Sequence, residues 1–162
     1  PVDPAHRAPV WRAMEHCLEQ GWVKSIGVSN YGEAHLDAMK KYANYMPSVN
    51  QVEYNPWLQR PHLKKATEDS GAKLMAYSPL ARGHRVDDPE LGAIAERLGC
   101  TPAQVAIKFC YDQGCITIPK SSNPSRIIEN IASLEVDISS EMDAIRALDE
   151  NYVSGWDPTT EP

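Results

Sequence analysis

The sequence predicts an α/β protein in which four short parallel strands alternate with helices. Proline and glycine divide the chain into regular pieces, short apolar runs alternate with stretches of helical periodicity, and each apolar run precedes a helix. Parallel strands need long crossover connections, which helices provide, so this order is typical of a parallel sheet covered by helices. Two architectures fit it: a doubly wound open sheet, or part of a (β/α) barrel.

The first half of the chain is predicted to hold three strands, each separated from the next by a helix. The helix over residues 8–20 has Pro9 in its first turn and Gly21 after its end. In order, the predicted elements are helix 8–20, strand 24–29, helix 33–45, strand 49–54, a helix from Pro61 to before Gly71, and strand 73–77.

The second half is predicted to hold one strand and four helices. Thr101, Pro102 and Gln104 form a capping-box pattern, which marks a helix start. In order, the predicted elements are a helix from Pro89 to Gly99, a helix from Pro102 to Gly114, strand 116–119, a helix from Pro124 to about Leu134, a helix from Ser139 or Ser140 to Leu148, and a polar tail.

Missing glycine motifs decide between the two architectures. The chain has no GxGxxG dinucleotide fingerprint and no Walker loop, both of which open α/β sheets commonly use for nucleotides. A barrel is therefore favoured. A complete eight-stranded barrel takes about 250 residues, so 162 residues with four strands correspond to about half of one.

Charge and composition exclude several function classes. There are 16 Lys and Arg against 22 Asp and Glu, a net charge of −6, so we expect no nucleic-acid partner. No apolar run approaches the roughly 20 residues of a membrane span. The four cysteines lack a CxxC pair or zinc spacing, which predicts free thiols, no metal site and a cytoplasmic location. The chain starts at Pro1 without a signal-peptide pattern, so no retained targeting segment is expected.

Polar side chains stand at the ends of the first three predicted strands. Ser29, Asn30 and Gln51 offer a hydroxyl and two carboxamides, and Tyr77 offers a flat aromatic face. A planar ring that bears a carboxamide could be stacked on the tyrosine and hydrogen-bonded at its edge. The alternative is structural: Ser29 and Asn30 cap a turn, and Gln51 belongs to a satisfied polar core layer.

The end of the fourth strand leads into a helix that carries two cations. A helix N-terminus attracts anions through its free N–H groups and dipole, and Lys120 and Arg126 add positive charge to it. Arg126 and Asn130 are four residues apart and share a helix face. We expect a phosphomonoester here; the alternative is an ordinary solvated helix start.

Four segments resemble the aldo-keto reductases in order and spacing. They are GVSN (27–30), NQVEYNP (50–56), AYSPL (76–80), and IPKS (118–121) with Arg126, Glu129 and Asn130. The resemblance spans roughly Val10 to Leu148. It implies a TIM-type (β/α)₈ barrel that reduces carbonyls with NADPH, of which this chain supplies about the last four βα units, a C-terminal helix and a tail.

The resemblance also implies roles for individual residues. Ser29, Asn30 and Gln51 hold the nicotinamide carboxamide and Tyr77 stacks on the ring, while Ser78 and Leu80 line the pyrophosphate. The adenosine 2′-phosphate is received by Lys120, Ser121, Ser122, Asn123 and Arg126, and the adenine by Glu129 and Asn130. Trp57 and Trp156 are candidates for the substrate pocket. Asn55 stands where many members of the family have His.

The family's catalytic Tyr, Lys, Asp and His all belong to the half of the barrel that this chain does not resemble, so no catalytic residue is assigned. Two functions remain open. The chain is either the NADPH-binding half of a carbonyl-reducing enzyme, acting with an N-terminal half, or a non-catalytic NADP-binding or assembly module that could self-associate. Residues 1–162 are expected to form one domain, and 149–162 a tail that either selects substrate or frays.

Overall fold

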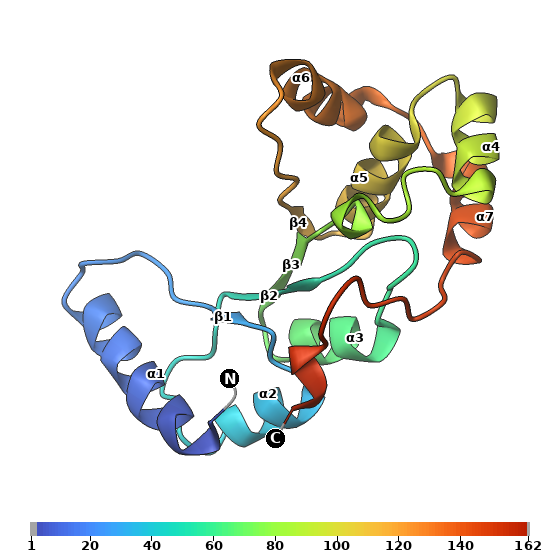
Figure 1. Ribbon diagram of the computed structural model, residues 1–162. Coiled ribbons are helices and arrows are strands. Elements are labelled where there is room, and N and C mark those ends of the chain that lie inside the picture. The colour runs from blue at the N-terminus through green and yellow to red at the C-terminus, as the bar shows by residue number, and fades with distance from the viewer. Residues whose placement is uncertain (1–2, 162) are drawn as a thin grey trace. The chain divides into compact units, whose positions relative to one another are not determined.

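The computed structural model describes residues 3–161 and divides them into two compact units (Figure 1). The first unit runs up to Val52 and adds residues 61–75 and those from Trp156 onward; the second contains residues 53–60 and 76–155. Pro1, Val2 and Pro162, which the predicted domain includes, lie outside the described residues. Among the described helices, none has the length and apolar character needed to cross a membrane.

The four predicted strands are present and form one sheet in chain order. They are β1 (Val28–Ser29), β2 (Val49–Glu53), β3 (Lys73–Tyr77) and β4 (Ile116–Thr117). Strands β1 and β2 are parallel, with Val28 opposite Asn50 and Ser29 opposite Gln51. Both outer strands are shorter than predicted. In β4, Ile118 still donates to the Ala76 carbonyl at 3.1 Å, but Pro119 has no N–H to continue the pairing.

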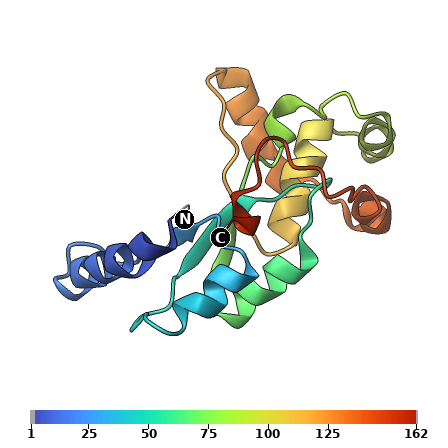
Figure 2. The ribbon, with the colours of Figure 1, turned by 60° about the horizontal axis from the view of Figure 1, so that its bottom comes forward.

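Helices follow the strands as the pattern predicts. They are α1 (Pro4–Glu19), α2 (Glu33–Met39), α3 (Pro61–Asp69), α4 (Pro89–Leu98), α5 (Pro102–Asp112), α6 (Pro124–Ala132) and α7 (Met142–Arg146), with short 3₁₀ turns at 81–83, 133–135, 139–141 and 158–160. In the first unit, α2 and α3 lie side by side in both views (Figures 1 and 2). The predicted capping box of α5 is confirmed: the Thr101 hydroxyl accepts from Gln104 N, and the Gln104 amide oxygen accepts from Thr101 N.

Helix boundaries differ from prediction most clearly in α1, α2 and α7, the last of which spans Met142–Arg146 after a 3₁₀ turn instead of running from Ser139 or Ser140 to Leu148. Helix α1 begins at Pro4 rather than at residue 8, since Asp3 caps it by accepting from Ala5 N at 2.9 Å, and Pro9 therefore lies inside the helix. Helix α2 ends at Met39 rather than at Tyr45. The buried Glu15 carboxylate accepts from Asn44 N at 2.6 Å and Tyr45 N at 2.9 Å, so these amides cannot continue the helix.

Each unit has its own buried core, and the four cysteines are free. Fully or almost fully buried side chains in the first unit include Trp11, Leu36, Met39, Leu63 and Leu74, and those in the second include Tyr54, Trp57, Leu91, Val105, Phe109 and Ile145. In the second unit, the rings of Tyr54 and Phe109 stack with centroids 6.2 Å apart. The core of the second unit thus includes residues that directly follow β2.

The end of the described chain packs on the start of α2 within the first unit. His35 Nδ1 accepts from Gly32 N at 2.9 Å, which leaves its Nε2–H to donate to the Glu161 carbonyl at 2.6 Å. Burial lowers the pKa of His35. The carbonyl of Thr159 lies only 2.0 Å from the place that a Cβ on Gly32 would occupy. This close approach requires glycine at position 32.

Gly32→Ala is expected to detach residues 156–161 and to lower the free energy of unfolding by roughly 1–3 kcal/mol, because the added methyl group overlaps Thr159. The matched control is Gly92→Ala in the middle of α4, where no atom lies within 4 Å of the added Cβ. This substitution should stabilise the helix by about 0.5–1 kcal/mol, because alanine favours a helix more than glycine does. Urea unfolding measures both. Equal effects of the two substitutions would contradict the close contact.

Acid is expected to weaken the packing of the chain end through His35. The pKa of His35 is lower in the folded than in the unfolded chain. The stabilisation of the folded state by neutral His35 is therefore complete above the unfolded pKa of 6.5 and is lost as the pH falls toward the folded pKa. A second proton at Nδ1 would face the Gly32 N–H. Urea unfolding between pH 7 and 5 should therefore show a steeper loss for the wild type than for His35→Gln. Parallel profiles would exclude this role.

Candidate nucleotide-binding cleft

The second unit contains a cleft of about 900 Å³ at the ends of β3 and β4. Its walls come from the residues after β3, the start of α5, the end of β4 and the inner face of α6. The lining residues are Tyr77, Ser78, Pro79, Leu80, Arg82, Gly83, Val86, Ala103, Ile118, Pro119, Lys120, Ser121, Arg126, Glu129 and Asn130. Eight of the thirteen residues predicted to bind the cofactor line this cleft.

The basic end of the cleft holds two cations that are available to an anion. Lys120 follows β4 and Arg126 lies in the first turn of α6, and both side chains are exposed. Within residues 3–161 neither side chain forms an ion pair, whereas Lys64, Arg97 and Lys108, for example, each lie within 4 Å of a carboxylate. An unpaired Arg and Lys beside a helix N-terminus can bind a phosphate.

The turn before α6 is built from polar side chains that bind the backbone. The Asn123 carboxamide oxygen caps the helix, accepting from Ser125 N at 2.9 Å and Arg126 N at 3.4 Å. The Ser121 hydroxyl accepts from Asn123 N at 3.2 Å. Ser122 and Asn123 are exposed and are not among the lining residues. Asn123 therefore shapes the helix start, while Ser121, Lys120 and Arg126 face the cleft.

The far end of α6 is tied to the start of α5. The Thr101 hydroxyl, which caps α5, donates to the Glu129 carboxylate at 2.6 Å. The backbone carbonyl of Asn130 accepts from the Ser133 hydroxyl at 2.6 Å, and Asn130 also lines the cleft. A carboxylate and a carboxamide held on one helix face can pair with the donors and acceptors of a heterocyclic base.

The wall after β3 has an unusual backbone. Ser78, Ala81 and Arg82 have φ values of +48°, +45° and +55°, a left-handed region that non-glycine residues seldom adopt. Asn55, which is fully buried, donates its side-chain amide to the Ser78 carbonyl at 3.3 Å and accepts from Trp57 N at 3.1 Å. Where many family members have His, this chain therefore has a carboxamide that holds the turn.

Ser29, Asn30 and Gln51 meet in the first unit, at the paired ends of β1 and β2. The Gln51 carbonyl accepts from Asn30 N at 2.8 Å and from the Ser29 hydroxyl at 3.0 Å. Among the described residues, the buried Asn30 Oδ1 has no hydrogen-bond partner, and Gln51 Nε2 donates only to the Met75 sulfur, a weak acceptor. These two carboxamides retain the capacity to bind another amide.

The buried Asn50 holds this strand end in place and has no predicted role. Its side chain donates to the Tyr31 carbonyl at 2.8 Å and to the Thr67 hydroxyl at 3.2 Å, and accepts from Tyr31 N at 3.3 Å. Asn50 and Gln51 are consecutive residues of β2, and consecutive side chains of a strand point to opposite faces. This alternation is the sequence signal that distinguishes the buried amide of Asn50 from the more exposed amide of Gln51.

The structure places the two tryptophans proposed for the substrate pocket in different surroundings. Trp57 belongs to the second unit, is 1% exposed and donates its indole N–H to Asp88 at 3.1 Å. Trp156 belongs to the first unit, is 58% exposed and donates to the Glu161 carboxylate at 2.9 Å. Neither residue lines the cleft, and their assignment to substrate stays a prediction.

Seven lining residues were given no role from the sequence: Arg82, Gly83, Val86, Ala103, and also Pro79, Ile118 and Pro119, which lie within the segments that resemble the family. The first three lie in the connection between β3 and α4. Their position directly after a strand end is the signal that could have found them, because ligands of parallel sheets bind at those ends. Residues 3–161 hold no group of three or more His, Cys, Asp or Glu side chains that could bind a metal ion.

Comparisons with known proteins agree with the resemblance. The chain matches the Aldo/keto reductase family over residues 1–150. It is 43% identical over 144 residues to Aldose reductase B of Dictyostelium discoideum, covering 87% of this chain and 46% of that protein. It is 39% identical over 149 residues to the Glyoxal reductase of Bacillus subtilis (strain 168), covering 91% and 54%.

A solved structure shows the same architecture. An aldo-keto reductase from a Medee basin deep-sea metagenome library superposes with a TM-score of 0.81 and 32% identity, over 88% of this chain and 54% of that one. The chain thus spans about half the length of the relatives it matches. Its four parallel strands and their helices form a partial barrel, as the sequence predicts. The chain belongs to the aldo/keto reductase family of oxidoreductases.

Proposed function

We propose that this chain is the NADPH-binding half of an enzyme that reduces aldehydes or ketones to alcohols. The observation that carries the proposal is the pair of cations, Lys120 and Arg126, which have no ion-pair partner among the described residues and lie in a cleft of a chain with net charge −6. A local cation pair in an acidic protein favours one small anion over an extended polyanion. The 2′-phosphate of NADPH is such an anion.

Each unit, taken by itself, holds residues that suit one part of NADPH. In the second unit, Lys120 and Arg126 would hold the 2′-phosphate, and Glu129 and Asn130 would contact the adenine. In the first unit, the unsatisfied Asn30 Oδ1 fits the amide donor of a carboxamide, which supports assignment of Ser29, Asn30 and Gln51 to the nicotinamide end.

The cofactor, when bound, supplies a hydride for the carbonyl carbon. This chain's own residues would bind and orient it, with Tyr77 at the wall of the cleft as the face against which a ring can stack. The group that protonates the carbonyl oxygen is proposed to come from an N-terminal half, in the same polypeptide or in another. Four free thiols support a reducing compartment, and we propose the cytoplasm.

A second candidate is a non-catalytic NADP-binding or assembly module. It is favoured by exposed apolar side chains of the second unit at β4 and along α6 and the turn after it. They are Ile116, Ile118, Ile127, Ile128, Ile131 and Leu134, each at least 38% exposed. Exposed apolar residues beside a strand at the sheet edge invite pairing with another chain. Both candidates require nucleotide binding and differ in turnover.

Arg126→Ala is expected to weaken NADPH binding by about 10- to 100-fold and NADH binding by less than about twofold. Only NADPH carries the 2′-phosphate, and a charge-assisted pair contributes about 1.5–3 kcal/mol. Fluorescence titration with both nucleotides measures the two dissociation constants. The matched control is Arg146→Ala, which removes the same charge from an exposed pair with Asp143 and should change neither. Equal losses for NADPH and NADH would refute the assignment.

Carbonyl reduction is expected only when the chain is combined with an N-terminal half. The experiment mixes the chain with the N-terminal half of a related reductase and follows NADPH oxidation with an aldehyde. Turnover in the mixture would support the enzymatic function, provided that it is lost at limiting NADPH when the chain carries Arg126→Ala. A folded complex that binds NADPH without turnover would instead favour the non-catalytic module, and a chain that binds neither nucleotide would exclude both.

A further inference from the structure

One wall of the cleft is a loop that leaves β3 and enters α4, here called the wall loop (residues 81–88). Arg82, Gly83 and Val86 of this loop line the cleft. Its end is fixed by Asp88, which caps α4 by accepting from the backbone N–H of the first helical turn and also accepts from the Trp57 indole at 3.1 Å. Its middle has no such anchor in the second unit's core, because residues 82–84, 86 and 87 are exposed.

A second segment of the same unit, here called the strap (residues 149–155), is held firmly. The carbonyl of the buried Trp57 accepts from Glu150 N at 3.1 Å and from Tyr152 N at 2.9 Å. Ser154 N lies 3.2 and 3.3 Å from the two carboxylate oxygens of Glu53, which is 2% exposed. The strap is therefore attached to the buried residues that follow β2, and the tail is ordered at these positions.

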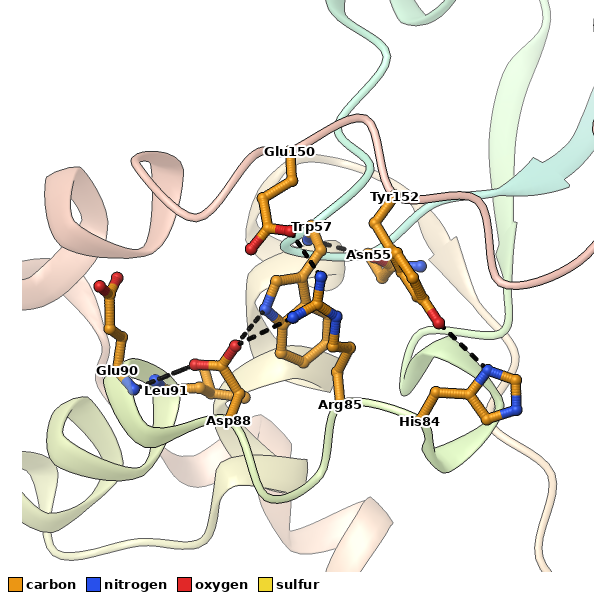
Figure 3. Close-up of polar contacts among 9 residues, drawn as sticks. All are labelled: Asn55, Trp57, His84, Arg85, Asp88, Glu90, Leu91, Glu150 and Tyr152. Atoms are coloured by element: carbon orange, nitrogen blue, oxygen red, sulfur yellow. Dashed lines mark hydrogen bonds and ion pairs between the residues drawn. The ribbon is translucent and has the colours of Figure 1, made fainter.

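Arg85 connects the wall loop to the strap (Figure 3). Its guanidinium forms an ion pair with the Glu150 carboxylate and lies over the Tyr152 ring, 4.4 Å from the centroid. The same group is 3.8 Å from Asp88, and its side chain is only 27% exposed. One guanidinium thus contacts two residues of the strap and the end of its own loop.

Two more contacts join the same segments. The Tyr152 hydroxyl lies 3.3 Å from Nδ1 of His84, the residue next to Arg85 (Figure 3). The Arg82 guanidinium lies 3.1 Å from the place that a Cβ on Gly155 would occupy, so the strap also passes against a lining side chain. The contacts are distributed along the middle of the wall loop, where the core provides no anchor.

We propose that Arg85 is a positioning residue that latches the wall loop to the strap and thereby slows release of a nucleotide from the cleft. The latch holds the three lining residues in place without contacting the nucleotide. The effect on nucleotide release rests on the proposed function, whereas the latch itself is a property of the nucleotide-free chain. This gives residues 149–155 a role in the cofactor site, beyond substrate selection or a frayed end.

The alternative is that Arg85 makes surface contacts of no consequence, since many exposed ion pairs contribute little to stability. The two explanations differ in what removal of Arg85 does to the loop. A latch predicts local opening of residues 81–88 with the rest of the unit unchanged, whereas a neutral surface pair predicts no change anywhere.

Hydrogen exchange of the nucleotide-free chain tests the latch directly. The amides of Gly83, His84 and Asp88 bond to the carbonyls of Leu80, Ala81 and Arg85, and report opening of the loop. In Arg85→Ala their exchange should accelerate about fivefold, while core amides of α5 keep their rates. The matched control, Arg146→Ala, should change none of these rates. Unchanged exchange in Arg85→Ala, or equal acceleration in both variants, would overturn the proposal.

A double-mutant cycle assigns the effect to the contact with the strap. Glu150→Gln should accelerate exchange of the loop less than Arg85→Ala, and the combined variant should be no faster than Arg85→Ala alone, because the lost interaction is shared. Additive effects would mean that Arg85 and Glu150 act independently. Arg85→Lys keeps the positive charge but loses the planar group over Tyr152, so partial rescue is expected.

Nucleotide release provides the functional test. In stopped-flow displacement, Arg85→Ala should raise the NADPH dissociation rate about fivefold and leave the association rate within twofold, a split that general destabilisation would not produce. If hydrogen exchange shows that the loop opens in Arg85→Ala but the NADPH dissociation rate is unchanged, the proposed effect on nucleotide release is wrong. If the wild-type chain binds no NADPH, the proposed function fails, and the exchange experiment still decides whether the latch exists.

Discussion

Backbone N–H and carbonyl groups at the carboxyl ends of the strands need hydrogen-bond partners where water does not reach them. The rest of the structure depends on which groups provide these partners. Besides pairing of backbone with backbone, two buried carboxamides provide such partners. Asn50 bonds both the N–H and the carbonyl of Tyr31 in the first unit, and Asn55 bonds the Ser78 carbonyl and the Trp57 N–H in the second. An amide can donate and accept at once, which a hydrophobic residue of similar size cannot. Each unit thus presents ordered polar groups at a strand end.

The same constraint bears on the anion site that we propose for this acidic chain. Most described Lys and Arg side chains that are paired lie on helix surfaces, as in Lys64 with Glu68 and Lys65 with Asp69, where they bind their own helix. Lys120 and Arg126 follow a strand end and lie beside a helix start, where Asn123 already takes the cap position. No carboxylate is needed for structure there, so the two cations remain available.

Most of the fold follows from local rules that the sequence displays. Pro61, Pro89, Pro102 and Pro124 each begin a helix, and apolar runs mark the strands. Among the boundaries that were predicted wrongly, the start of α1 depends on a local cap by Asp3, whereas the end of α2 depends on a tertiary contact. The end of α2 is set by Glu15, which lies in a different helix, and no pattern within residues 33–45 indicates that a carboxylate will take Asn44 N and Tyr45 N.

The candidate site also contains both residues that the sequence predicts and residues whose place depends on the tertiary structure. Residues at strand ends, such as Lys120 and Tyr77, could be predicted because topology brings them to one edge of a sheet. The same rule points to the connection that holds Arg82, Gly83 and Val86, but which of its residues line the cleft depends on the conformation of an irregular loop. The surroundings of Trp57 are equally hidden, because a large aromatic side chain after a strand suits a substrate pocket as well as a core. The structure shows that it is 1% exposed and that its indole N–H donates to Asp88.

Backbone strain links the wall loop to the strap. Ser78, Ala81 and Arg82 adopt left-handed conformations that cost roughly 1 kcal/mol or more each for residues with a Cβ, so neighbouring contacts must hold them. Asn55 holds Ser78 from the core side, whereas Arg82 is exposed and its guanidinium lies against the strap at Gly155. A strained turn relaxes unless both of its ends are fixed. Fixing by Arg85 therefore explains how a short, exposed loop can keep three lining residues in one arrangement.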